Sequence, residues 1–249
     1  MGRSGEPVIS VRGLTKNYGD NEVLKGIDFD VHRGEVVALL GPNGAGKTTT
    51  IEILEGSRKR DGGGVSVLGL DPFDVDDLWR SRVGVVMQSW RDHARWSPRD
   101  LVEHLSGLYQ PYVEATGREM RTPDEVLELV GLADQAKQKI RTLSGGQRRR
   151  LDVAIGILGR PELLFLDEPT AGLDPQGRRE FHELIHALVD HDNATVLLTT
   201  HDLDEAGKLA DRIMILAGGR IVANGSEDEL AASIAHEAQV RWRAGGVAH

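Results

Sequence analysis

A glycine-rich loop directly after a short apolar run constrains the fold of this chain more than any other feature. The run, Val36–Leu40, contains no polar residue, which predicts a strand that is buried on both faces of a sheet. The loop that follows consists of Gly41, Pro42, Asn43, Gly44, Ala45, Gly46, Lys47 and Thr48. This spacing matches the P-loop, in which glycines let backbone N–H groups approach phosphate oxygens at a helix N-terminus. The sequence therefore predicts an α/β fold with a nucleotide site at the end of this strand.

The last residues of the loop carry the cation and the hydroxyl group of the predicted site. We expect Lys47 to reach the β- and γ-phosphates of ATP and the Thr48 hydroxyl to ligate Mg²⁺. Thr49 comes next, at the start of the predicted helix, and we assign it to the nucleotide-binding residues as well. The alternative is a glycine-rich turn that carries Lys and Thr by coincidence, and the preceding strand argues against it.

A second apolar run, residues 163–166, ends in two adjacent carboxylates, Asp167 and Glu168. Open α/β sheets place their chemistry at the carboxyl ends of their strands. We therefore expect Asp167 to hold Mg²⁺ through water and Glu168 to orient or deprotonate the attacking water. The alternative is a strand end with two solvated acids, which the pairing with a P-loop disfavours.

Two adjacent glycines follow Ser144, in the segment Leu143-Ser144-Gly145-Gly146-Gln147. Ser144 and Gln147 have the spacing of a capping box, which predicts the start of a helix. Glycine is a poor helix former, so the pair is explained best if this helix end approaches an anion closely. The P-loop already gives the chain one such anion site. We therefore expect this second site to contact a nucleotide held by another copy of the chain.

The remaining apolar runs and helix signals predict how the chain is organised. Further buried strands are expected at residues 83–87 and 195–199, and their alternation with helices indicates a mostly parallel sheet. Residues 8–11 and 23–31 alternate apolar and polar side chains, as half-buried antiparallel strands do.

Ser97-Pro98 and Thr122-Pro123 mark helix starts in a polar stretch that is poor in strands. Gly218-Gly219 is expected to form a hairpin turn and Ser226 to begin a short helix. We predict a P-loop NTPase core with an N-terminal antiparallel β subdomain and an inserted helical subdomain.

Charge and composition exclude several classes of function. The formal net charge is −9 and the chain has no cysteine. An acidic balance argues against broad nucleic-acid binding, and the lack of cysteine excludes disulfides and thiolate metal sites. No apolar run approaches the roughly 18 residues of a membrane helix.

Taken together, these motifs resemble the ATP-binding subunits of ABC (ATP-binding cassette) transporters over about residues 8–235. The resemblance implies that Tyr18 stacks on adenine and that Gln88 senses both Mg²⁺ and the attacking water. It implies that Asp174, in the segment Ala171-Gly172-Leu173-Asp174, lies in a loop that crosses a dimer interface. It also implies that His201 contacts the γ-phosphate, and that Ser144 to Gln147 contact ATP bound to the other subunit.

The same resemblance implies one nucleotide-binding domain over residues 1–249. Its ATP-binding core would comprise residues 8–88 and 160–235, its helical subdomain residues 89–159, and its tail residues 236–249. The implied activity is ATP hydrolysis coupled to transport through a separate integral membrane permease. The implied partners are that permease and a second nucleotide-binding subunit, as a homodimer in the ATP state, with no nucleic acid. The implied location is the cytoplasm, on the inner face of the cell membrane. More narrowly, the chain is similar to bacterial drug-resistance and ABC-2-type exporters.

The alternative is a soluble cassette ATPase that acts on DNA, ribosomes or iron–sulfur assembly. DNA-repair cassettes place long coiled coils between the two motifs, whereas only 95 positions separate Thr48 from Leu143 here. Ribosome-acting cassettes carry two copies in one chain, and each motif occurs once here. An iron–sulfur scaffold ATPase stays open on layout. A P-loop kinase would have no use for the segment that begins at Leu143.

Two groups of side chains have open interpretations. Trp90 and Trp96, with Arg91 and Arg95, follow Gln88, where relatives contact the membrane subunit. They could equally pack the helical subdomain. We expect Arg148 to Arg150 to form a solvated helix face, and the alternative is a contact with the membrane subunit.

Overall fold

The computed structural model describes residues 6–86 and 93–232. Its first sheet is antiparallel and has the strand order β2-β1-β4. The strands are β1 (Ile9–Tyr18), β2 (Asn21–Val31) and β4 (Gly62–Val67). The predicted N-terminal antiparallel strands are thus confirmed. Strand β1 is longer than predicted because register shifts and a left-handed Gly13 interrupt its alternation after Val11.

The second sheet has six strands in the order β5-β6-β7-β3-β8-β9. They are β5 (Val83–Val86), β6 (Leu163–Asp167), β7 (Thr195–Thr200), β3 (Val36–Leu40), β8 (Arg212–Ala217) and β9 (Arg220–Gly225). The first five are parallel and β9 pairs antiparallel with β8. This confirms the mostly parallel sheet and the hairpin at Gly218-Gly219. Strands β6, β7 and β3 are neighbours and run parallel, so their carboxyl ends lie at the same edge of the sheet.

The helices begin where their capping residues predict. The structure contains α1 (Lys47–Leu54), α2 (Asp77–Arg80), α3 (Pro98–Ala115), α4 (Pro123–Leu129), α5 (Gly145–Ile157), α6 (Pro175–Asp192), α7 (Leu203–Leu209) and the 3₁₀ turns Ala133–Gln135 and Ile140–Thr142. Ser97, Thr122 and Ser144 each cap a helix, as expected, and each forms a complete capping box. Ser226 forms the same reciprocal bonds with Glu229, and residues 227–232 are helical. Among the described residues, no helix has the length and apolar character that crossing a membrane requires.

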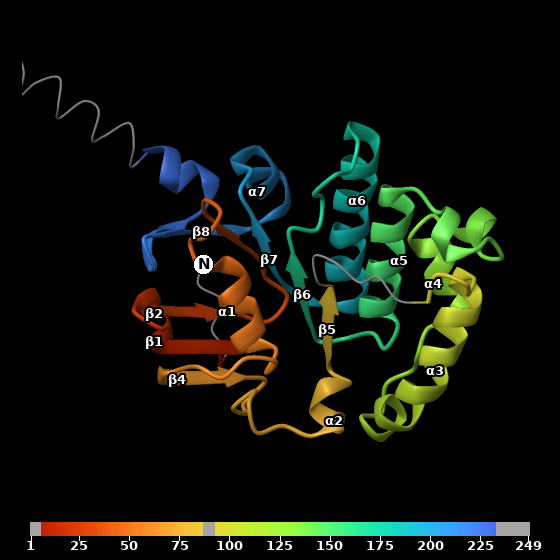
Figure 1. Cartoon of the computed structure of the whole chain (residues 1–249), viewed down its shortest axis with the longest axis horizontal. Coiled ribbons are helices and arrows are strands. Elements are labelled where there is room, and N and C mark those ends of the chain that lie inside the picture. Colours follow the sequence, from red (N-terminus) through yellow and green to blue (C-terminus); the bar gives the residue numbers. More distant parts are fainter. Residues whose placement is uncertain (1–5, 87–92, 233–249) are drawn as a thin grey trace, which may run out of the picture.

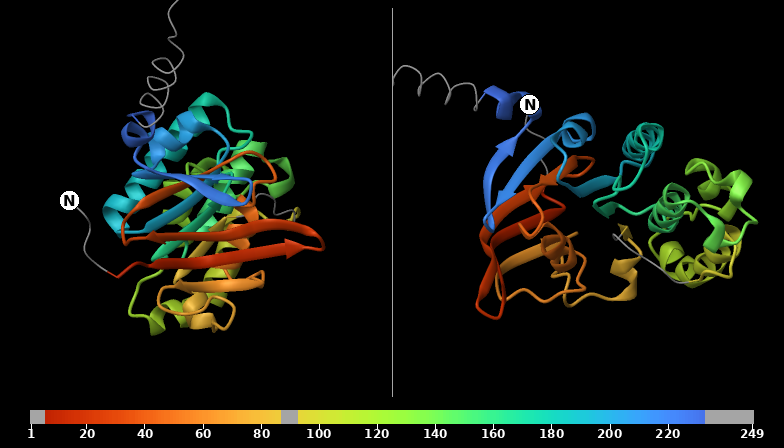
Figure 2. Two further views of the ribbon diagram at one scale, coloured as in Figure 1. Left: turned by 90° about the vertical axis from the view of Figure 1, so that its left-hand side faces the viewer. Right: turned by 45° about the horizontal axis from the view of Figure 1, so that its top comes forward.

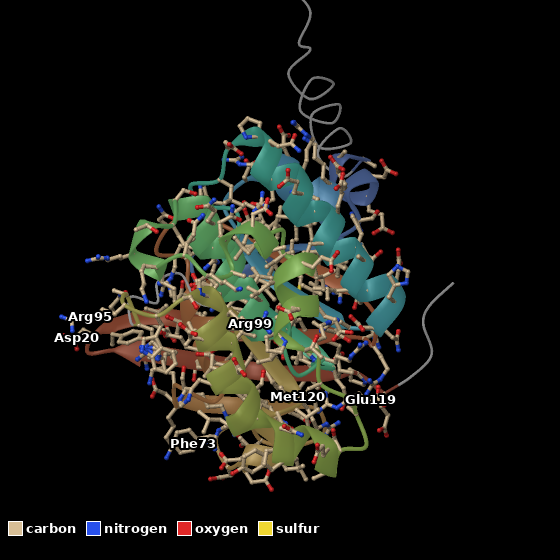
Figure 3. The ribbon with its side chains drawn as sticks, turned by 90° about the vertical axis from the view of Figure 1, so that its right-hand side faces the viewer. Asp20, Phe73, Arg95, Arg99, Glu119 and Met120 are labelled. Carbon is tan, nitrogen blue, oxygen red and sulfur yellow. The ribbon has the colours of Figure 1, made fainter. Side chains whose placement is uncertain are left out.

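Two hydrophobic cores lie on opposite faces of the six-stranded sheet. On one face, α1 packs between the two sheets, where Ile51 and Leu54 join Phe165 of β6. On the other face, α5 and α6 cover the sheet, and α3 and α4 pack against α5 through Leu101 and Leu127 (Figures 1 and 2). Figure 3 views this helical side, with Arg99 of α3 and Met120 of the α3–α4 connection on it. Helices α3, α4, α5 and α6 therefore lie on the opposite face of the six-stranded sheet from α1.

Candidate functional site

The loop between β3 and α1 needs its glycines. A Cβ atom on Gly41 would lie 2.3 Å from the carbonyl oxygen of Leu216. Gly46, the N-cap of α1, has a φ of 107°, and a Cβ there would lie 2.7 Å from Leu24. Gly44 also adopts a positive φ. Only glycine fits these conformations without strain, so the loop holds the curved backbone that phosphate binding requires.

Lys47 places its ammonium group at the centre of this loop. The side chain is only 6% exposed, and Nζ donates to the carbonyl oxygens of Gly41, at 2.7 Å, and Pro42, at 3.3 Å. Nζ also lies 3.2 Å from Oε1 of Glu168. The P-loop cation and the acidic end of β6 therefore meet, as the two motifs predict.

Asp167 is buried at the end of β6 and accepts two hydroxyl hydrogen bonds. Thr48 Oγ1 donates to Oδ2 at 2.9 Å, and Thr199 Oγ1 donates to Oδ1 at 2.6 Å. Carboxylate and hydroxyl oxygens are hard donors of the kind that Mg²⁺ prefers. Since Thr48 and Asp167 are already within hydrogen-bond distance, their oxygens fit a shared magnesium ion.

Glu168 points away from Asp167 because the chain turns sharply between them. Its φ is 48°, in the left-handed region that non-glycine residues seldom adopt. The backbone N–H donates to Thr199 Oγ1 at 3.0 Å. The carboxylate lies between Lys47, at 3.2 Å, and Nδ1 of His201, at 2.7 Å. Glu168 is buried, whereas the His201 side chain is 60% exposed.

Ser144 is the N-cap of α5, and β6 lies between α5 and α1 (Figure 1). Ser144 N–H donates to Gln147 at 2.9 Å, and Gln147 N–H donates to Ser144 Oγ at 3.2 Å. A Cβ on Gly145 would meet nothing within 4 Å, and one on Gly146 would make ordinary contact with Leu173. Packing within this chain therefore does not explain the two glycines.

The other predicted site residues are placed as follows. The Tyr18 hydroxyl lies 3.5 Å from Thr49 Oγ1 at the start of α1. Tyr18 is 42% exposed, and the Arg58 guanidinium lies 5.3 Å from its ring centroid. Asp174 caps α6 by accepting from Gly177 N–H at 2.6 Å. Gln88 lies outside the described residues.

The aromatic and arginine residues after Gln88 are only partly described. Trp90 and Arg91 lie outside the described residues. Trp96 is 36% exposed and makes an edge-on contact with the His104 ring, at a centroid distance of 5.1 Å. Arg95 is exposed and projects from the edge of the molecule (Figure 3).

The expectation of a solvated face for Arg148 to Arg150 is wrong. Arg149 is 8% exposed and donates to two backbone carbonyls, whereas Arg150 pairs with Glu180 and Arg148 with Asp152. Successive helical residues are rotated by about 100°, so three consecutive arginines cannot share one face. Thr199 contacts both Asp167 and Glu168, and no sequence motif predicted it as a site residue. Its position opposite Asp167 depends on the pairing of β6 with β7.

Comparison with known proteins agrees with this geometry. Residues 24–171 match the family model described as ABC transporter. The chain belongs to the ABC transporter family. It is 42% identical to the daunorubicin resistance ATP-binding protein DrrA3 of Streptomyces coeruleorubidus, over 91% of this chain and 71% of that protein. It is 40% identical to the Nod factor export ATP-binding protein I of Ralstonia nicotianae, over 95% of this chain and 71% of that protein.

Solved structures of ABC transporter subunits share the fold. An ATP-binding subunit of an ABC transporter superposes with a TM-score of 0.78 at 26% identity, covering 92% of this chain and 93% of its own. The dimeric bacterial cassette MJ0796 gives a TM-score of 0.74 at 26% identity, covering 88% and 98%. This ABC transporter protein is thus an ATP-binding subunit and an ATPase. The predicted similarity to drug-resistance exporters is confirmed, and the relatives give no support to a soluble cassette without a transporter.

Proposed function

We propose that this ABC transporter ATPase hydrolyses ATP, as a dimer, to drive export through a separate membrane subunit. The observation that carries the proposal is the Glu168 carboxylate, which lies between Lys47 of the P-loop and His201 at the end of β7. This arrangement places a carboxylate beside the phosphate-binding loop, where it can accept a proton from water. Export is supported by relatives whose names describe drug resistance and Nod factor export.

In this proposal Thr48 and Asp167 hold Mg²⁺. The ion, when bound, neutralises charge on the phosphates and helps to orient them. Lys47 binds the phosphates, and Tyr18 stacks on adenine at the other end of the nucleotide. Glu168 orients and deprotonates the attacking water, while His201 and Gln88 complete the surroundings of the γ-phosphate.

The second part of the proposal is a composite site. Ser144 to Gln147 would contact ATP held by the other subunit, and Asp174 would lie at the interface between them. The open space around Gly145 supports this, because it leaves the N-terminus of α5 accessible to a ligand from outside the chain. The dimeric state of the related cassette MJ0796 supports it as well.

The remaining parts of the proposal concern layout and location. Residues 8–88 and 160–235 would form the ATP-binding core, residues 89–159 the helical subdomain, and residues 236–249 a tail. A polytopic membrane subunit would hold the dimer on the cytoplasmic face of the membrane and would select the exported compound.

Affinity purification of the tagged chain from detergent-solubilised native membranes tests this function. We expect a polytopic membrane protein to co-purify, and we expect vesicles that contain both proteins to transport only with hydrolysable ATP. A matched preparation of the Lys47→Ala variant should retain the membrane partner and lose transport. Recovery of the chain with ribosomes or iron–sulfur assembly proteins, and without a membrane protein, would contradict the proposal.

A further inference from the structure

Arg149 connects the helix that begins at Ser144 to the two residues on either side of Glu168. The guanidinium Nη2 donates to the carbonyl oxygen of Asp167 at 2.7 Å, and Nε donates to that of Pro169 at 2.9 Å. Both acceptors are backbone carbonyl oxygens, so these hydrogen bonds restrain the backbone conformation on either side of Glu168. The guanidinium therefore spans the backbone of Glu168 from one side.

Because Arg149 is buried, its guanidinium depends on these hydrogen-bond acceptors in place of water. The side chain is 8% exposed, and burial lowers the pKa of its guanidinium, against the nearby carboxylates of Asp152 and Asp167. An arginine stays charged in a protein, so this buried cation needs acceptors in fixed positions. The planar fork of arginine suits two acceptors that are set apart, which a lysine ammonium does not match as well.

Glu168 needs external support because its backbone is strained. It adopts a φ of 48°, and such conformations persist only when the surrounding structure holds them. Thr199 Oγ1 binds its N–H at 3.0 Å, and Arg149 binds the carbonyls before and after it. This turn directs the carboxylate toward Lys47 and His201, away from the partners of Asp167.

We propose that Arg149 is a positioning residue that holds the Glu168 turn and thereby links helix α5 to the Glu168 carboxylate. The inference rests on the proposed function, because it takes Glu168 as the base. A movement of α5, whose first residues would meet the nucleotide of the other subunit, would thereby reach the backbone of Glu168 through the two hydrogen bonds of Arg149. In this proposal Arg149 acts through the backbone of Glu168 and not by contacting the nucleotide or the attacking water.

A double-mutant cycle tests the inference. Arg149→Met keeps the apolar stem and removes both hydrogen bonds. We expect kcat to fall about 10- to 100-fold, which is the range that a small misplacement of a reacting group produces. The KM for ATP should change less than about threefold, since Arg149 lies outside the predicted nucleotide contacts. In a Glu168→Gln background, measured by single turnover, Arg149→Met should have little further effect, because the group that it positions is already gone.

The controls separate positioning from general damage. Arg150→Met, on the same helix and paired with the partly exposed Glu180, should change kcat by less than about twofold, and by the same factor in the parent and in the Glu168→Gln background. Equal losses from Arg149→Met in both backgrounds would overturn the inference. If Arg149→Met does not fold, the milder Arg149→Lys is measured in the same cycle and should show the same dependence on Glu168. Full activity of Glu168→Gln alone would instead refute the proposed role of Glu168.

Discussion

The Glu168 carboxylate and the His201 imidazole are direct partners, with Oε2 and Nδ1 2.7 Å apart. The two residues are 33 positions apart in the sequence and come from the ends of the neighbouring strands β6 and β7. The other carboxylate oxygen lies 3.2 Å from Lys47 Nζ. The Glu168 carboxylate, the Lys47 ammonium and the His201 imidazole thus meet at one edge of the sheet. The first prediction concerns the carboxylate of this cluster.

Glu168→Gln should separate hydrolysis from binding. The amide keeps the shape of the side chain but cannot accept a proton, so we expect hydrolysis to fall by about 10²–10⁴-fold. ATP binding should survive, and the uncleaved nucleotide should favour the dimer by mass action. Size-exclusion chromatography with and without ATP, together with a phosphate-release assay, measures both effects.

Asp167→Asn is the matched control for this experiment. It changes the adjacent carboxylate, which accepts hydrogen bonds from Thr48 and Thr199, whereas the Glu168 carboxylate lies against His201. We expect this variant to stay monomeric with Mg·ATP because the proposed metal site is weakened. A Glu168→Gln protein that hydrolyses ATP like the parent would assign the base to another residue, with His201 the next candidate.

Lys47→Ala should severely weaken nucleotide binding. The substitution removes a buried ammonium group that lies 2.7 Å from Gly41 O, within the loop that would hold the phosphates. We expect both ATP affinity and hydrolysis to fall severely, and titration with a fluorescent ATP analogue measures the affinity. Lys59→Ala, at an exposed lysine next to the Phe73 ring, should bind and hydrolyse ATP as the parent does. Near-normal turnover by the Lys47 variant would refute the assignment of the loop.

Mixing two inactive variants should restore activity if the site is composite. Lys47→Ala removes the phosphate contact of one subunit, and Ser144→Arg blocks the N-terminus of α5 in the other. Their heterodimer retains one intact loop opposite one intact α5, so we expect ATPase activity above that of either parent. A tagged pull-down establishes that heterodimers have formed. If these heterodimers are no more active than the two parents, the nucleotide is not shared between subunits.

Glu205→Ala should destabilise the end of β7. Glu205 is buried, and its two oxygens accept hydrogen bonds from Thr170 and, at 2.5 Å, from Thr200. Removing the carboxylate leaves both hydroxyls without these acceptors, at a cost of about 1–3 kcal/mol for each unsatisfied buried group. Chemical denaturation should show this loss, whereas Asp204→Ala at the exposed neighbouring position should change the unfolding free energy by less than about 0.5 kcal/mol. A parent-like midpoint for Glu205→Ala would contradict the expected role.

Asp152→Asn should stabilise the protein at neutral pH and have less effect in acid. Burial raises the pKa of Asp152 to about 6, against the attraction of Arg148 and Arg149. The folded state therefore binds this proton more tightly than the unfolded state, so ionisation of Asp152 lowers stability as pH rises from about 4 to about 6. The asparagine cannot ionise and escapes this loss. Thermal melts at pH 5 and pH 8 should show a larger gain at pH 8, and an equal or reversed difference would contradict the raised pKa.

Sequence by itself determined those features that depend on neighbouring residues. Strand β3 has the bounds that its apolar run predicts, and the loop after it has the backbone that its glycines allow. Ser97, Thr122 and Ser144 begin helices because a capping box is formed within four consecutive residues. The length of β1 was missed, since bulges remove the alternation on which strand prediction depends.

The motifs predicted that the P-loop and the end of β6 would meet, but only the tertiary structure decided which further side chains contact Asp167 and Glu168. The sheet order places β7 between β3 and β6, which brings Thr199 to Asp167 and His201 to Glu168. Nothing in the sequence near Arg149 showed that it would be buried, because that depends on the packing of α5 against the end of β6. The left-handed turn at Glu168 has the same origin, since no glycine marks it. Local sterics and capping act over a few residues, whereas strand order and helix packing depend on the burial of apolar surface across the whole chain.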